Sequence, residues 1–212
     1  MKEAGQVIRV TLVDAYYDFS LLMTLNLLWL AASLPVLTLP PALFGLQYAA
    51  YQMVHERRAV SAWGTFFEGF RSYFWLSWRW ALLNLLMLAM LSANYLFYGQ
   101  FSTDWVPWVQ GIFIGLATLW TLIQITTLPL LMEQQERRVW TALRNSLVLF
   151  ARRPGFSLVL CLSIGLLAVI STIFMLPWIL FTISLISYVA NRCTAYLVRQ
   201  LTDNEESRRH VI

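Results

Sequence analysis

Long apolar runs alternate with short basic segments along the chain, and this pattern predicts helices that cross a membrane. Six runs stand out, at 19–37, 41–55, 80–98, 107–132, 155–175 and 177–198. Most of them approach or exceed the ~18 residues typical of a membrane helix. The run 41–55 is the shortest, and at ~1.5 Å per residue it falls short of a hydrocarbon core ~30 Å thick. We expect its flanks to complete it, the bilayer to thin locally, or its neighbours to shield it.

The stretch ASLPVLTLPPALFG, at 32–45, interrupts the first apolar region with three prolines. Proline removes a backbone donor and breaks a helix interior. The simplest interpretation is a turn that joins two helices on the outer side of the membrane. One long kinked span, which gives a five-span protein, remains the alternative. A cleaved export signal is disfavoured, because Asp14 and Asp18 precede the run where such signals carry positive charge.

The basic residues support the six-span prediction. With six spans, all 15 Lys and Arg residues face one side, and the opposite loops at 38–40, 99–107 and 175–177 carry only Asp104. Cytoplasmic loops are enriched in Lys and Arg, so both termini are predicted to be cytoplasmic. The five-span alternative moves only Lys2 and Arg9 to the outside and therefore stays open.

Each pair of spans follows a segment with apolar residues at helical spacing. These segments are 5–18, 61–78 and 137–152. The apolar stripes consist of Ile8, Leu12, Ala15, Tyr16 and Phe19, then Trp63, Phe66, Phe67, Phe70, Phe74 and Trp78, and then Trp140, Leu143, Leu147 and Phe150. Such spacing predicts amphipathic helices. Their apolar faces fit the lipid headgroup layer or the protein's own helices, and the pattern does not choose between them.

Composition agrees with a membrane protein. Of the 212 residues, 59% are hydrophobic and 12% are charged, against about 25% charged in a soluble domain. The net charge of +4 follows from arginine in cytoplasmic loops, so we expect no nucleic-acid partner. The predicted fold is all-α: one transmembrane domain over 1–212, a six-helix bundle of three hairpins, each preceded by a cytoplasmic-side amphipathic helix.

Reactive groups are sparse. Cys161 and Cys193 lie far apart in apolar segments, His55 stands at the end of a span, and His210 lies in the polar tail. No metal-ligand spacing or phosphate-binding glycine motif is present, so we expect no cofactor, no metal and no enzymatic activity.

The spans contain neutral amides in place of charges: Asn26, Gln47, Asn84, Asn94, Gln110 and Gln124. Amides bond across membrane helices, so a structural role is the default. The alternative is a polar path for a small solute, with Trp29 and Trp120 beside it. A continuous cavity that joins Asn26, Asn84 and Gln124 would favour this alternative.

Two further features suggest surfaces for contact. Gly111 and Gly115 form a small-xxx-small pattern, which serves packing inside the chain, a homodimer or a partner subunit. A cytoplasmic set of arginines forms a candidate face for a partner or for anionic membrane lipid. This set comprises Arg57, Arg58, Arg71, Arg137, Arg138 and Arg144.

The stretch NLLWLAASLPVLTLPPALFGLQYA, with Asn26, Trp29, Pro35, Thr38, Pro40 and Ala42, resembles the N-terminal signature of the YesL family. These are small bacterial multi-pass membrane proteins grouped under a domain of unknown function. Here Pro40 replaces the usual Gly before the Pro of the turn. Family members are often encoded beside carbohydrate ABC importers. The resemblance implies a plasma-membrane protein with an accessory or regulatory role, working with the importer's permease subunits. It supplies no catalytic residues.

Overall fold

The computed structural model describes residues 2–56, 61–174 and 177–209, with side chains described for 3–56, 61–174 and 177–202. All regular structure in these ranges is helical, as expected for an all-α protein. The helices are α1 (Lys2–Tyr17), α2 (Phe19–Ser33), α3 (Leu39–His55), α4 (Ala62–Ser72), α5 (Phe74–Tyr98), α6 (Val106–Glu133), α7 (Val139–Arg152), α8 (Pro154–Phe174) and α9 (Ile183–Arg209), with a 3-10 turn at Val36–Thr38 and a π-helical turn at Trp178–Thr182.

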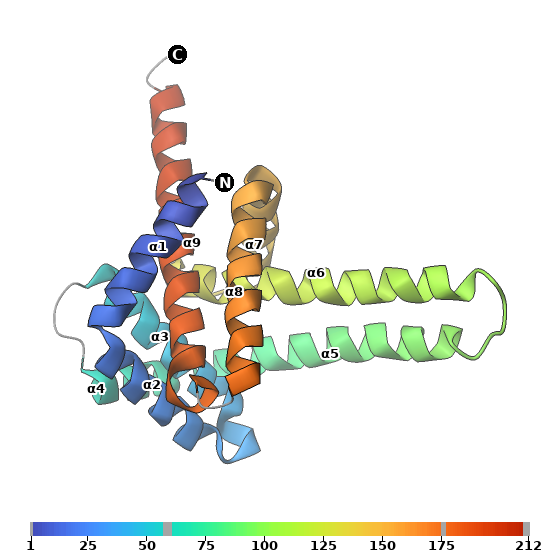
Figure 1. Ribbon diagram of the computed structural model, residues 1–212, viewed down its shortest axis with the longest axis horizontal. Coiled ribbons are helices and arrows are strands. Elements are labelled where there is room, and N and C mark those ends of the chain that lie inside the picture. Colours follow the sequence, from blue (N-terminus) through green and yellow to red (C-terminus); the bar gives the residue numbers. More distant parts are fainter. Residues whose placement is uncertain (1, 57–60, 175–176, 210–212) are drawn as a thin grey trace.

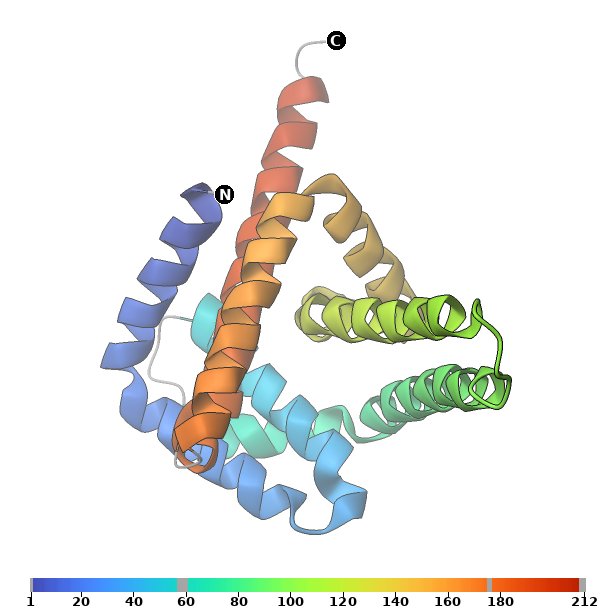
Figure 2. The same ribbon diagram turned by 45° about the vertical axis from the view of Figure 1, so that its right-hand side comes forward.

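The proline-rich stretch is a turn between two helices. Helix α2 ends at Ser33, the 3-10 turn follows, and α3 begins at Leu39. Pro40 and Pro41 lie in the first turn of α3, where helix N–H groups have no intrahelical partner and proline is tolerated. The chain reverses there, and α3 returns beside α2 (Figure 2).

One predicted surface helix differs from the structure. The segment 61–78 was expected to form a single amphipathic helix, but α4 ends at Ser72 and α5 starts at Phe74. The break lies at Tyr73, whose buried ring packs against Phe44 and Tyr48. Anchoring this ring in the core ends the surface helix six residues early, so the second part of the segment continues into the long helix α5.

The amphipathic stripes divide between two environments. In α1, Ile8 and Ala15 are buried whereas Leu12 and Tyr16 are exposed. The same division occurs in α4, which buries Phe66 and exposes Trp63, and in α7, which buries Leu143 and exposes Trp140. Packing on the protein's own helices is therefore confirmed for one half of each stripe. Contact of the other half with lipid stays a prediction.

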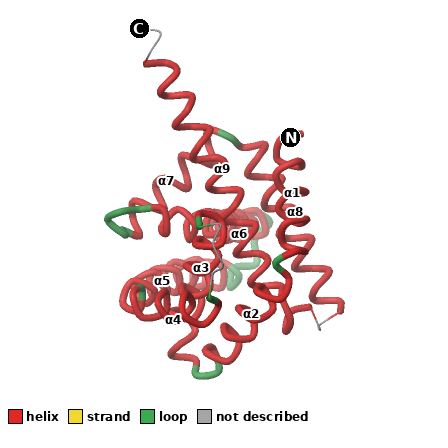
Figure 3. Tube along the Cα trace, turned by 90° about the vertical axis from the view of Figure 1, so that its left-hand side faces the viewer, coloured by secondary structure: helices red, strands yellow, loops and turns green. Residues whose placement is uncertain are grey.

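The three hairpins do not form the expected single bundle. Both termini lie at the top of Figure 1, the α2–α3 turn and the ends where α8 and α9 meet lie at the bottom, and the α5–α6 loop lies far to the right. The α5–α6 hairpin thus runs across α8 and α9, and Figure 3 shows it nearly end-on. Its buried residues lie mainly at its base, at Ser77 on α5 and between Ile123 and Met132 on α6, whereas Leu91 and Val106 are buried farther along the hairpin.

Three apolar clusters hold the rest together. One joins α1, α8 and α9 around Leu160 and Tyr188; another joins α2, α3 and α4 around Leu46 and Phe66. The third joins α3, α6 and α7 around Leu131 and includes Tyr73. All three are stabilised by burial of apolar surface, and helices α3 and α9 lie at the centre of the fold.

Two glycines allow α3 and α4 to approach closely. A Cβ on Gly45 would lie 2.8 Å from the carbonyl oxygen of Phe66, and one on Gly69 would lie 2.6 Å from the Cβ of Tyr48. Neither position has room for a side chain, so this helix pair depends on both glycines. The small-xxx-small pattern in the sequence pointed instead to Gly111 and Gly115.

Three helices, α5, α6 and α8, are long and apolar enough to cross a membrane. In the most apolar 18-residue windows of these helices, 6%, 22% and 28% of the residues are buried within the chain. A helix that is apolar on all sides and unburied needs a lipid or protein environment. The chain is therefore membrane-associated.

Candidate functional site: polar clamps and a groove beside α9

The side chain of Asn26 on α2 forms hydrogen bonds to the backbone of the π-helical turn and the start of α9, an arrangement called here the Asn26 clamp. Its Nδ2 donates to the carbonyl oxygens of Trp178, at 3.0 Å, and Ile179, at 2.8 Å, while its Oδ1 accepts from the backbone N–H of Ser184 at 3.1 Å. A π-helical turn takes backbone groups out of the α-helical pattern. Since Asn26 is fully buried, its amide supplies the partners that water cannot.

A pair of hydroxyls supports the same turn from the α8 side. The hydroxyl of Thr182 donates to Ser171 Oγ at 2.8 Å, and both residues are buried. The π-helical turn is thus held from α2 and from α8. Asn26 belongs to the sequence signature, and its role in the structure is to fix α9 against α2.

A second amide pair joins α3 to α9. Asn191 Nδ2 donates to Gln47 Oε1 at 2.7 Å and to the carbonyl oxygen of Ser187 at 2.8 Å. Both amide side chains are buried. Asn191 was not among the predicted polar residues, although an amide inside the apolar run 177–198 was a signal that sequence reasoning had available.

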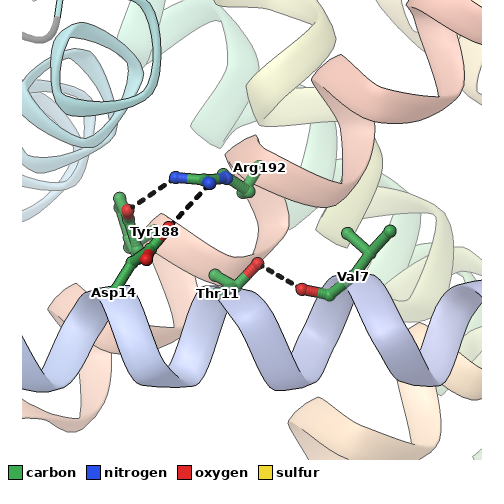
Figure 4. Close-up of polar contacts among 5 residues, drawn as sticks. All are labelled: Val7, Thr11, Asp14, Tyr188 and Arg192. Atoms are coloured by element: carbon green, nitrogen blue, oxygen red, sulfur yellow. Dashed lines mark hydrogen bonds and ion pairs between the residues drawn. The ribbon is translucent and has the colours of Figure 1, made fainter.

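An ion pair connects α1 to α9. Arg192 Nη2 lies 2.7 Å from Asp14 Oδ2, and Arg192 Nη1 donates to the Tyr188 hydroxyl at 3.1 Å (Figure 4). On α1, the Thr11 hydroxyl donates to the carbonyl oxygen of Val7 at 2.7 Å. Asp14 and Arg192 are about one-third exposed, so the pair orients the guanidinium more than it stabilises the fold.

The guanidinium of Arg192 lines a polar groove between α1, the end of α3 and α9. The groove has a volume of about 690 Å³ and is lined by Glu3, Gln6, Val7, Val10, Met53, Val54, His55, Arg192, Ala195, Tyr196 and Arg199. This volume lies in the range of small-molecule sites. The groove has no signature in the sequence, because its residues come from three segments far apart in the chain.

His55 closes the α3 side of this groove. Its Nε2 lies 3.0 Å from Glu133 Oε1 on α6, and its Nδ1 lies 3.0 Å from the carbonyl oxygen of Tyr51. The imidazole also stacks on the Tyr51 ring, with centroids 4.2 Å apart. These contacts fix His55 as a link between α3 and α6.

The amides of the α5–α6 hairpin bond to tryptophans. Trp80 Nε1 donates to Gln124 Oε1 at 3.0 Å, and Trp120 Nε1 donates to Asn84 Oδ1 at 2.9 Å. These bonds hold the hairpin closed above its base. In contrast, Asn94 Nδ2 donates within its own helix, to the carbonyl oxygen of Met90 at 2.8 Å.

The remaining predicted polar residues are dispersed. Gln110 Nε2 donates to the Tyr95 carbonyl oxygen at 3.3 Å near the hairpin loop, and Asn26 bonds to α9. Asn26, Asn84 and Gln124 do not line the polar groove, nor the apolar hollow at Leu91–Ala117. The structure therefore gives each of these amides a local structural partner.

The rest of the turn signature is structural as well. The hydroxyl of Thr38 donates to the carbonyl oxygens of Ala32 and Pro35 and so closes the turn. The indole N–H of Trp29 is buried without a hydrogen-bond partner among the described residues.

The predicted arginine face is only partly assembled. Arg57 and Arg58 lie outside the described residues. Arg138 Nη2 pairs with Glu136 Oε2 at 2.9 Å on the surface, and the Arg137 guanidinium lies 4.2 Å from the Tyr73 ring centre. Burial raises the pKa of Tyr73, and the Arg137 charge acts against this rise. Arg71 on α4 and Arg144 on α7 are both exposed.

Gly111 and Gly115 are exposed on α6, and a Cβ added at either would meet nothing within 4 Å. Packing inside the chain, one of the three expectations for this pair, is thereby excluded for the described residues. The face is open to lipid or to another protein.

Among the described residues, no three His, Cys, Asp or Glu side chains lie close enough together to hold a metal ion. Cys161 and Cys193 are free thiols buried in α8 and α9.

One segment of the chain matches a known protein family. Residues 22–95 match the model of a family described as a protein of unknown function, DUF624. The match begins in α2 and ends in α5, so it includes the Asn26 clamp, the proline turn and the close α3–α4 contact. The comparisons with curated proteins and with solved structures return no match.

Proposed function

We propose that this chain is a non-enzymatic accessory or regulatory protein of the bacterial plasma membrane. In this proposal the chain has six spans and cytoplasmic termini, belongs to the YesL family and associates with the permease subunits of a carbohydrate ABC importer. Six spans across one bilayer require the α5–α6 hairpin, which runs across α8 and α9 in Figure 1, to lie along them in the membrane. The family match over 22–95 and the proline-turn signature support the family assignment. The importer association rests on the resemblance.

The observation that carries the accessory role is the unburied α5–α6 hairpin. Only 6% of the most apolar window of α5 is buried, and α6 presents Gly111 and Gly115 on an open surface. A small residue every fourth position lets another membrane helix approach closely. A helix needed only to fill its own bundle would place these glycines against a neighbour.

The alternative, a small solute transporter or channel, requires a polar path. Asn26, Asn84 and Gln124 each bond to a neighbouring element, and none of them lines the polar groove or the hollow between α5 and α6. Their arrangement gives this alternative no support.

Affinity purification from the native membranes in mild detergent tests the proposal. The tagged chain is compared with the double variant Gly111→Leu, Gly115→Leu and with the control Gly165→Leu, because a Cβ at Gly165 on α8 also meets nothing within 4 Å. We expect an importer permease to co-purify in near-equal amount with the native chain and the control, and at least tenfold less with the double variant. Recovery of the chain alone in all three would overturn the accessory role.

A further inference from the structure

We propose that the polar groove between α1, α3 and α9 binds a phosphate ester, supplied by the headgroup of an anionic lipid. The groove is lined by residues of α1 near the N-terminus and by residues of α9 between Arg192 and Arg199, and both termini lie at the same end of the molecule, at the top of Figure 1. Under the proposed topology this end is the cytoplasmic surface, where lipid phosphates lie.

The cationic side of the groove is built on one face of α9. Arg192 and Arg199 are seven residues apart, which is about two helical turns, or about 10 Å along the axis. Residues at this spacing project to the same side of a helix. Both line the groove, with Tyr196 between them. Two guanidinium groups at this separation can contact a phosphate and the polar group attached to it.

Hydrogen-bond donors remain available on these residues. Arg192 uses two of its five N–H donors on Asp14 and Tyr188, which leaves the others for a ligand. The Tyr196 hydroxyl accepts from Gln200 Nε2 at 2.7 Å, so its own hydrogen is free to donate toward an acceptor. The stacked Phe156 ring, at 5.9 Å between centroids, holds Tyr196 in place. The donor set is therefore positioned before a ligand arrives.

Among the described side chains that line the groove, one cation has no ion-pair partner. Asp14 pairs with Arg192, His55 lies against Glu133, and Glu3 lies 3.8 Å from Arg153. Arg199 has no ion-pair partner among the side chains that the structure describes. Arginine forms strong, charge-assisted hydrogen bonds with phosphate, so Arg199 is the expected anchor.

The apolar part of the groove lining favours an amphiphilic ligand over a fully polar one. The groove lining also includes the apolar side chains of Val7 and Val10 on α1 and of Met53 and Val54 on α3. This apolar wall adjoins the arginines and can contact the glycerol and the first acyl carbons of a lipid. A free phosphate ester shares the headgroup chemistry but makes no use of this wall.

Native mass spectrometry of the full-length protein in detergent counts bound ligand directly. The probes are dioctanoyl phosphatidylglycerol, dioctanoyl phosphatidylcholine and glycerol 3-phosphate. Arg199→Gln is compared with Arg79→Gln, which removes the same charge from an exposed position at the start of α5, outside the groove. We expect phosphatidylglycerol to bind more tightly than phosphatidylcholine, Arg199→Gln to weaken it about tenfold, and Arg79→Gln to change it less than twofold.

The outcomes separate the possible sources of the phosphate. Weak binding of glycerol 3-phosphate identifies the lipid, whereas equal binding that depends on Arg199 identifies a soluble phosphate ester in the same site. Equal affinity for the two lipids, or equal loss in both variants, overturns the proposal. Arg199→Lys keeps the charge and serves as a rescue variant, and thermal unfolding by tryptophan fluorescence verifies that each variant is folded.

Discussion

Replacing Asn26 by leucine tests the clamp on the π-helical turn. Leucine has a similar volume, so the change removes three hydrogen bonds without leaving a large cavity: those to the carbonyl oxygens of Trp178 and Ile179 and that from the N–H of Ser184. Polar contacts inside membrane proteins average about 0.6 kcal/mol, and a buried group left unpaired costs about 1–3 kcal/mol. For three contacts we expect a loss of about 2–3 kcal/mol in the free energy of unfolding.

The assay is unfolding in mixed micelles by titration with dodecyl sulfate, followed by tryptophan fluorescence. Asn94→Leu is the matched control, because that amide bonds only to the Met90 carbonyl of its own helix and its loss should cost less than about 0.5 kcal/mol. Equal stability of the two variants would refute the assignment of Asn26 as the residue that holds α9 to α2.

Two further changes test the packing and the ion pair. Gly69→Ala should destabilise by about 1–3 kcal/mol, since the new Cβ would lie 2.6 Å from the Cβ of Tyr48, whereas Gly165→Ala meets no atom within 4 Å and should be neutral or stabilising. Asp14→Asn and Arg192→Gln, combined in a double-mutant cycle, should show a coupling of only about 0.2–1 kcal/mol, because the pair is partly exposed. Both are measured by the same unfolding titration. Tolerance of Gly69→Ala, or a coupling well above this range, would contradict the described contacts.

The sequence was informative wherever a local pattern decides the outcome. The apolar run 41–55 predicted α3, and the amphipathic spacing over 137–152 predicted α7; the helices are Leu39–His55 and Val139–Arg152. Prolines predicted the turn after α2, because proline restricts the backbone whatever the tertiary fold. Helical spacing identified α1 and α7 as amphipathic, although it could not say which side of each stripe faces protein.

Contacts between segments far apart in the chain could not be predicted from local sequence patterns. The three groups that bond to Asn26 lie more than 150 positions away, and nothing local marks the π-helical turn that exposes them. No sequence motif includes Gly69, although its backbone packs closely against Tyr48 of another helix. The direction of the α5–α6 hairpin is set by the anchored ring of Tyr73 and by packing at the hairpin base, neither of which has a sequence signature. The polar groove combines three distant segments for the same reason.

The topology can be measured most directly by labelling single cysteines in intact bacterial cells with a membrane-impermeant maleimide, after replacing the buried Cys161 and Cys193 by alanine. Six spans with cytoplasmic termini predict that Leu37→Cys in the first turn and Thr103→Cys in the α5–α6 loop react from outside. Under the same topology, Ser61→Cys before α4 and Arg144→Cys on α7 react only after permeabilisation. External labelling of Arg144→Cys, or protection of Leu37→Cys until the membrane is permeabilised, would contradict the account.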